Sequence, residues 1–131
     1  IGNQESESRI PIIMPKATAV RSIEIDYKNN VTFYFDPVRR AIFKNSFQNS
    51  YGIDFSTSEG TTTVLIPDNL AYVENMAYDW ISQNLYFTDI GRVAVVNINQ
   101  PKQMRRDLIK RDQIFGLAID PNSGYLFYST I

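Results

Sequence analysis

The sequence predicts an all-β fold assembled from repeated four-stranded antiparallel units. Three stretches carry this prediction: DYKNNVTFYFD at 26–36, DWISQNLYFTD at 79–89 and DPNSGYLFYST at 120–130. In each stretch an Asp comes first, a polar turn follows, and large apolar residues lead to the closing position. The opening Asp residues are 53 and 41 residues apart, and self-similarity at a period of about 40 residues indicates a repeat architecture.

Short apolar runs rich in aromatic and β-branched residues alternate with clusters of Gly, Asn, Asp, Pro and Ser, which is the pattern of strands and tight turns. No long helical periodicity interrupts it. We expect hairpin-like breaks at 28–30, 81–84 and 121–124. The predicted strands are 10–14, 20–26, 31–36, 40–47, 61–66, 74–79, 84–89, 92–98, 105–109, 115–120 and 125–130.

The second copy shows how one unit is built. VENMAYD forms a strand, NLYFTD pairs back on it, RVAVVNI follows, and RRDLI closes the sheet. Four antiparallel strands in about 40 residues are typical of a β-propeller blade. The motif strands FYFD and LYFTD carry bulky residues at successive positions, which indicates burial on both faces. Each blade therefore has to pack against neighbouring blades.

Two polar segments allow more than one interpretation. The first interval exceeds the second by 12 residues, and the excess falls in the Ser/Thr/Gly-rich segment 48–63. It is either a long loop at a blade edge or a recognition loop on a rigid scaffold. The run 102–112 holds five basic and two acidic residues. It suits sulfated glycans or acidic ligands, and it equally suits an outer edge strand that charge protects from pairing.

Composition excludes several classes of function. With 13 basic and 14 acidic residues, the charge gives no reason to expect nucleic acid or an anionic membrane as the main partner. No apolar run approaches membrane-spanning length, so this segment is not expected to insert into a bilayer. The chain has no Cys and no His, which excludes internal disulfides, thiolate catalysis and His-dependent nucleophiles. We expect no metal site and no cofactor.

The repeated stretch resembles the YWTD repeat of the low-density-lipoprotein-receptor family, the class B repeat that builds six-bladed propellers. The motif falls at Tyr86–Asp89 in the second copy, at Phe33–Asp36 in the first and at Phe127–Thr130 in the third. GLAIDPNSGYLFY also resembles the family's lead-in to the motif. The likeness covers 10–131 in broad pattern and is most specific over 73–131.

The resemblance implies a structural motif, with aromatics between blades and an Asp that bonds within and between sheets. Residues 10–19 are expected to supply a closing-blade strand, 20–72 and 73–113 the first two repeats, and 114–131 the start of a third. The chain is then about half a ring and needs the remaining blades of the propeller as partners. The residues with an expected structural role are Asp26, Tyr34, Asp36, Asp79, Trp80, Tyr86, Phe87, Asp89, Asp120 and Tyr128.

Ligands of this family often dock where the turn after the motif meets the segment entering the next blade. Signalling members carry acidic residues after their first motif, whereas this chain has PVRRAI there, which favours an acidic partner surface. Ordinary solvated loop residues are the alternative. The candidate ligand-binding residues, carried over by position, are Arg39, Arg40, Tyr72, Glu74, Arg92 and Phe115.

The resemblance implies a non-catalytic, extracellular segment of a single-pass receptor that binds a protein ligand or organises adjoining EGF-like or ligand-binding modules. Acid-triggered release through His, known in the family, is not available to this segment. A nidogen-like matrix protein is the alternative, and a calcium-dependent propeller hydrolase is a remote one. Asn30-Val31-Thr32 forms a glycosylation sequon at a predicted turn, which is compatible with a secreted setting.

Overall fold

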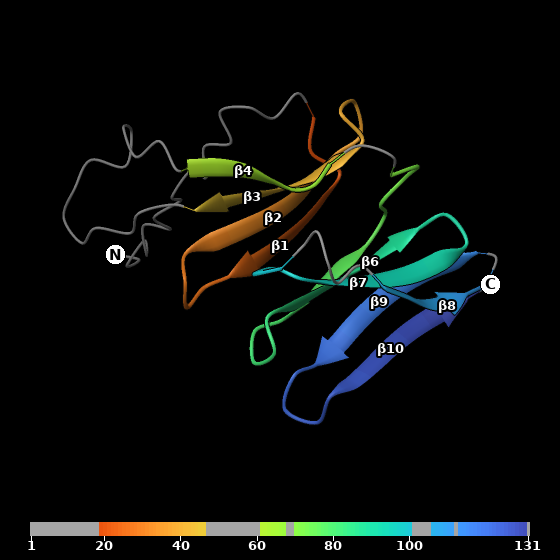
Figure 1. Cartoon of the computed structure of the whole chain (residues 1–131). Helices are drawn as coiled ribbons and strands as arrows, with labels where there is room; N and C mark the ends of the chain where they lie inside the picture. The colour runs from red at the N-terminus through yellow and green to blue at the C-terminus, as the bar shows by residue number, and fades with distance from the viewer. Residues whose placement is uncertain (1–18, 47–60, 68–69, 101–105, 112, 131) are drawn as a thin grey trace, which may run out of the picture.

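The computed structural model describes residues 19–46, 61–67, 70–100, 106–111 and 113–130. Within these ranges all regular secondary structure is β-strand, arranged in three antiparallel sheets (Figure 1). No helix in the described part of the chain is long and apolar enough to cross a membrane.

The first two sheets each contain four strands in simple sequence order, and the third contains two. This is the blade pattern that the sequence predicted. The first sheet comprises β1 (Ser22–Asp26), β2 (Val31–Asp36), β3 (Ala41–Ser46) and β4 (Thr61–Ile66). The second comprises β5 (Met76–Asp79), β6 (Asn84–Asp89), β7 (Arg92–Asn97) and β8 (Arg106–Lys110). The third comprises β9 (Ile114–Asp120) and β10 (Tyr125–Thr130).

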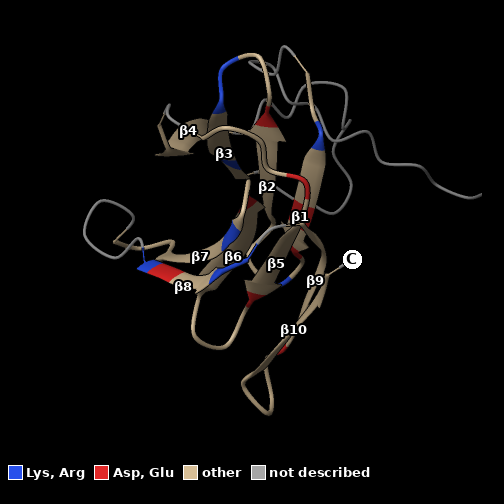
Figure 2. Cartoon of the chain, turned by 90° about the vertical axis from the view of Figure 1, so that its right-hand side faces the viewer, with Lys and Arg blue, Asp and Glu red and all other residues tan. Residues whose placement is uncertain are grey.

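The sheets lie next to one another with their first strands innermost. Strand β5 contacts β1 on one side and β9 on the other, and Figure 2 shows these three strands together, with β4 and β8 at the outer edges. Successive blades around a common axis have this arrangement.

The turn after each innermost strand is built the same way in all three sheets. We call these the inner turns: 27–30, 80–83 and 121–124. The opening Asp accepts hydrogen bonds from turn amides; Asp79, for example, bonds to the nitrogens of Ile81 and Ser82 at 2.9 and 3.1 Å. The last turn residue has a left-handed backbone, with φ of 53° at Asn30, 60° at Gln83 and 74° at Gly124. The repeated Asp is thus a turn cap.

The main core lies between the first and second sheets. Alternate residues of β2 face the second sheet, where the Phe33 ring lies 4.8 Å from that of Tyr78. Phe87 of β6 is fully buried in the same cluster. The intervening residue, Tyr34, stacks on Phe43 in a separate buried cluster. Both faces of β2 are therefore buried, and each large aromatic contributes about 1.5–3 kcal/mol.

The remaining motif residues are less covered. Trp80 belongs to an inner turn and is 49% exposed, so it lies outside the core. Tyr86 is half-buried, while Tyr128 is 40% exposed. On the other side of β10, Tyr125 and Phe127 are 66% and 57% exposed, and their rings meet edge to face.

The strand boundaries agree with the prediction to within two residues wherever the structure describes them. The largest shifts are two residues: β1 begins at Ser22 instead of residue 20, and β5 begins at Met76 instead of residue 74, where the preceding residues connect two sheets. Residues 61–63, which were also assigned to the long polar segment, start β4. The rest of that segment, and the predicted strand 10–14 with the closing-blade region, lie outside the described residues.

Candidate functional site: the connection face

The chain passes from the first sheet to the second across one end of both. Strand β4 ends with Ile66 opposite Ile42, at the end of the sheet that carries the β2–β3 turn, and residues 70–75 lead to β5. We call this end the connection face and define it as residues 37–40, 70–75, 90–92 and 113–115. All six candidate ligand-binding residues belong to it. The inner turns lie at the opposite end of the sheets.

Asp89, the last motif residue of β6, holds the connection in place. Its Oδ1 accepts hydrogen bonds from the backbone nitrogens of Ala71 and Tyr72 at 2.9 and 3.0 Å. Its Oδ2 accepts one from Arg92 Nη2 at 2.8 Å. The residue is 2% exposed, and a buried carboxylate requires such partners. The motif Asp therefore links the second sheet to the segment arriving from the first.

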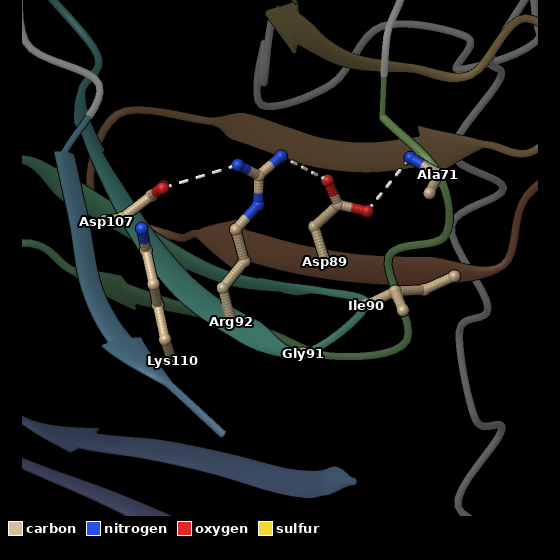
Figure 3. A pocket seen from close by; sticks show the side chains of 7 residues that line it. All are labelled: Ala71, Asp89, Ile90, Gly91, Arg92, Asp107 and Lys110. Atoms are coloured by element: carbon tan, nitrogen blue, oxygen red, sulfur yellow. Dashed lines mark hydrogen bonds and ion pairs between the residues drawn. The ribbon is translucent and has the colours of Figure 1, made fainter. Parts of the chain in front are cut away.

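The charges around Asp89 form a row, Asp107–Arg92–Asp89 (Figure 3). Arg92 Nη1 also lies 3.3 Å from Asp107 Oδ2. Burial alone would raise the pKa of Asp89, but the hydrogen bonds from Arg92, Tyr72 and Ala71 outweigh it and hold that pKa below its usual value. The Arg92 pKa is raised, chiefly by its hydrogen bond to Asp89. Both groups are charged across the physiological range.

Arg40, on the β2–β3 turn of the first sheet, forms a hydrogen bond with the same connection. Its Nε donates to the Leu70 carbonyl at 2.8 Å, and its backbone is left-handed with φ of 55°. Asp36 accepts hydrogen bonds from the Val38 and Arg39 amides at 2.9 and 3.2 Å and so stabilises the turn that presents Arg40. The connection is thus bonded to both sheets.

Tyr72 packs into the join between the sheets. Its ring meets the Phe35 ring edge to face at 6.3 Å, and the Arg21 guanidinium lies 5.5 Å from its centroid. Arg39 is exposed, and its guanidinium lies 5.5 Å from the centre of the Phe43 ring. These contacts are cation–π interactions, which are worth about 0.5–1 kcal/mol at exposed sites.

The third sheet is joined to this face as well. Asn75 Nδ2 donates to the Phe115 carbonyl of β9. At the end of the second sheet, just before the chain enters β9, the Arg111 amide donates to the Gly91 carbonyl at 3.0 Å. The Phe115 side chain is 43% exposed, and Glu74 is exposed beside it in the chain's path from one sheet to the next. Backbone and side-chain bonds therefore tie all three sheets together at the connection face.

The structure brings only part of the candidate set together. Tyr72, Glu74 and Arg92 line one small pocket with Ile114. Arg39 and Arg40 lie on the neighbouring turn of the first sheet. Arg40 and Tyr72 make contacts that join the connection to the first sheet, and Arg92 pairs with Asp89 and Asp107 of its own sheet. The side chains of Arg39, Glu74 and Phe115 are exposed, as is that of Arg40.

Sequence reasoning did not identify Asp107 or Lys110, which lie beside the connection face. An open hollow of about 460 Å³ is lined by Ala71, Asp89, Ile90, Gly91, Arg92, Asp107 and Lys110 (Figure 3). Asp107 faces Arg92 because the β7–β8 register shifts between Val93 and Ala94. The basic run 102–112 indicated a charged surface that includes Lys110. The register shift that brings Asp107 to Arg92 is not indicated by any pattern in the sequence.

The side chains in and beside this face carry charges of both signs. Its carboxylate Asp89 is engaged in bonds that maintain the fold. No three acidic or metal-ligating side chains converge anywhere in the described ranges. Mixed charges around a fixed backbone suit recognition of a polar protein surface.

No protein-family model matches the chain. Protein sevenless of Drosophila melanogaster is 35% identical over 65 residues, which cover 50% of this chain and 2% of sevenless. Vitellogenin receptor Yl of the same organism is 32% identical over 79 residues, covering 57% of this chain and 4% of the receptor. The chain thus spans a small part of the length of these relatives.

A solved structure shares the fold. One chain in the crystal structure of a nidogen/laminin complex aligns with a TM-score of 0.67 at 21% identity, covering 85% of this chain and 39% of that chain. The tripled motif, the two four-stranded sheets and the start of a third agree with this likeness. The chain has the fold of a partial β-propeller, and its repeated motif resembles the YWTD repeat, the class B repeat of the low-density-lipoprotein-receptor family.

Proposed function

We propose that the chain is a non-catalytic segment of an extracellular receptor propeller that binds a protein ligand or organises adjoining EGF-like or ligand-binding modules. The observation that carries the proposal is the 32% identity to a vitellogenin receptor over 57% of the chain. The use of the motif carboxylate Asp89 as a bond between sheets supports a structural role for the repeat. We also propose that a single membrane-spanning helix, elsewhere in the protein, anchors this receptor in the membrane.

The connection face is the proposed ligand-binding surface. The side chains of Arg39, Glu74 and Phe115 are exposed on this face, and we assign direct contact with the ligand to these three. Arg40, Tyr72 and Arg92 are engaged in contacts with the connection or with Asp89. Their proposed part is to keep the surface rigid, which lowers the entropy lost on binding.

The charge of the surface favours an acidic element in the ligand near the first sheet. The Arg92 charge is shared between two carboxylates, whereas Arg39 is exposed with its guanidinium over an aromatic ring. Lys110 adds a second cation at the hollow beside Asp107. An acidic segment passing from Arg39 towards Lys110 would meet complementary charge.

The alternative is a nidogen-like matrix protein, supported by the fold shared with a chain of the nidogen/laminin complex. Both proposals place the propeller outside the cell and give it a protein partner. They differ in where the protein accumulates, because a receptor stays at the plasma membrane or is internalised. A propeller hydrolase is the remote third case and needs metal ligands from residues beyond those described.

The cellular location distinguishes these cases without knowledge of the ligand. Cells that express the natural full-length protein are surface-biotinylated, warmed, and stripped of surface label after set times. The receptor proposal predicts labelled protein at the surface, followed by internalisation. Accumulation in detergent-insoluble matrix supports the nidogen-like alternative. Protein confined to the cytosol contradicts both.

A photo-crosslinking amino acid tests the binding surface directly. It is placed at Glu74 on the connection face, and at Ser123 on an inner turn as the matched control, in the full-length protein on cells. We expect a protein adduct from position 74 and none from position 123, and we expect Arg39→Glu to reduce the adduct. Equal labelling from both positions contradicts this assignment of the surface.

The extracellular setting also implies modification of Asn30. This residue closes the first inner turn and is half-buried, so we propose that it carries an N-linked glycan. Mass spectrometry of the secreted protein before and after enzymatic deglycosylation measures the occupancy.

A further inference from the structure

The first inner turn presents an aromatic ring to solvent beside the proposed glycosylation site. Tyr27 is its first residue and is 81% exposed, the largest value among the large hydrophobic residues of the described chain. Its hydroxyl group alone does not account for this, because the whole ring is uncovered. Exposed aromatic surface of this kind is often a contact site.

The turn itself does not require Asn at position 30. The same position holds Gln83 and Gly124 in the other inner turns, all with positive φ. What the backbone demands is a residue that tolerates the left-handed region, and Asn is one of several. The first copy alone adds the sequon Asn30-Val31-Thr32, and no other Asn-X-Ser/Thr sequence occurs in the 131 residues.

Tyr27 and Asn30 are fixed relative to each other by the turn. Asp26 Oδ1 accepts hydrogen bonds from the Lys28 and Asn29 amides at 3.1 and 3.2 Å, and Oδ2 accepts one from Asn29 Nδ2 at 2.7 Å. Asp26 itself is 3% exposed. The first and fourth residues of such a tight turn have Cα atoms within about 7 Å, so a sugar attached to Asn30 is within reach of the Tyr27 ring.

Burial of Thr32 does not argue against the sequon. Its hydroxyl donates to the Asn45 carbonyl at 3.4 Å in the folded sheet, but glycan transfer acts on the chain before β2 and β3 pair. After folding, Val31 and Thr32 are buried, whereas Tyr27, Lys28 and Asn29 of the same turn are exposed, so the exposed end of the hairpin is where the glycan can extend.

We propose that the first N-acetylglucosamine on Asn30 stacks on the ring of Tyr27. The C–H bonds on one face of a pyranose are weakly positive, and the face of an aromatic ring is negative, so the two faces attract. The sugar covers apolar surface that is otherwise left in water, and the turn holds the ring in position. This inference rests on the proposed extracellular setting, and it assigns Tyr27 as the glycan's contact residue.

The test compares two trimmed forms of the natural full-length protein, secreted from cells that make only high-mannose glycans. Endoglycosidase H leaves the first N-acetylglucosamine, whereas peptide-N-glycosidase F removes it. Hydroxyl-radical footprinting then measures the oxidation rate of Tyr27. We expect oxidation to be about twofold slower when the single sugar remains, since stacking covers one of the two ring faces. Trp80, at the same position of the second inner turn without a sequon, is the internal control and should not change.

Asn30→Gln provides a form without glycan and without the new carboxylate that peptide-N-glycosidase F creates, and its Tyr27 should oxidise at the faster rate. An occupied Asn30 with equal Tyr27 oxidation in all forms overturns the inference and leaves the receptor proposal intact. An unoccupied Asn30 in the secreted protein overturns the inference as well. The receptor proposal fails separately, if the protein is found only in the cytosol.

Discussion

Replacing Asp89 with Ala removes the bond between the second sheet and the connection that precedes it. The carboxylate is 2% exposed and accepts hydrogen bonds from Ala71, Tyr72 and Arg92. Hydrogen bonds to a charged group are worth about 1.5–3 kcal/mol each, and breaking a buried ion pair costs about 3–5 kcal/mol. Arg92 keeps Asp107 as a partner, and the connection stays partly solvated. We therefore expect the free energy of unfolding to fall by about 2–4 kcal/mol, near the lower end of these ranges.

Hydrogen exchange of the peptide spanning 70–76 in the full-length protein measures this loss locally. A loss of about 2–4 kcal/mol corresponds to exchange roughly 30- to 700-fold faster at the Ala71 and Tyr72 amides. Asp120→Ala is the matched control, because Asp120 is exposed and caps only its own inner turn. It should leave the 70–76 peptide unchanged. If both substitutions affect that peptide equally, or neither does, the role assigned to Asp89 is wrong.

Three further perturbations follow from the core and from the pKa shifts. Phe33→Ala removes a fully buried ring that packs at a tilt against Tyr78, and it should destabilise the protein by about 3–5 kcal/mol in chemical denaturation. Trp80 is half-exposed, so Trp80→Ala should cost about 1 kcal/mol or less. The Asp89 pKa is lowered by its hydrogen bonds, which outweigh burial. The stability that the Asp89 carboxylate contributes is therefore complete above about pH 4 and is lost as pH falls through the folded pKa. Thermal melts below pH 4 should show a drop in melting temperature that the Asp89→Ala variant lacks. Burial raises the pKa of Tyr78, and the Asp26 and Asp79 carboxylates raise it further. The stability that neutral Tyr78 contributes is therefore complete below about pH 10 and is lost as pH rises further. A Tyr78→Phe variant should lose less stability above pH 10, and an equal loss in both proteins would contradict this role of Tyr78.

Much of the fold could be predicted because the repeat encodes it locally. The opening Asp of each copy is followed by a turn that it caps, and the last turn residue tolerates positive φ. Successive bulky residues on β2 indicated burial on both faces, and Phe33 and Tyr34 are indeed buried on opposite sides. These features depend on neighbours in sequence, so pattern alone reveals them.

The connection face was less predictable because its bonds join distant residues. Arg40 and Arg92 were expected to contact a ligand because of their positions in the repeat, but nothing in the repeat indicates that Arg40 binds the Leu70 carbonyl or that Arg92 binds Asp89 and Asp107. The contact between Asp107 and Arg92 depends on a register shift between β7 and β8, and the spacing of residues in the sequence does not predict such a shift. Trp80 was expected to have a structural role in the motif, but its position in a turn leaves it half-exposed.

A cryo-electron-microscopy map of the natural full-length protein tests the central claim most directly. The account predicts a closed ring of four-stranded blades in which β9 and β10 are the inner half of a blade. The exposed side of the third sheet, with Tyr125 at 66% and Phe127 at 57% exposure, should pack against a further blade, and Asp89 should bridge to the connection at Ala71 and Tyr72. A map in which Tyr125 and Phe127 face solvent, or in which the sheets do not share a central axis, would contradict it.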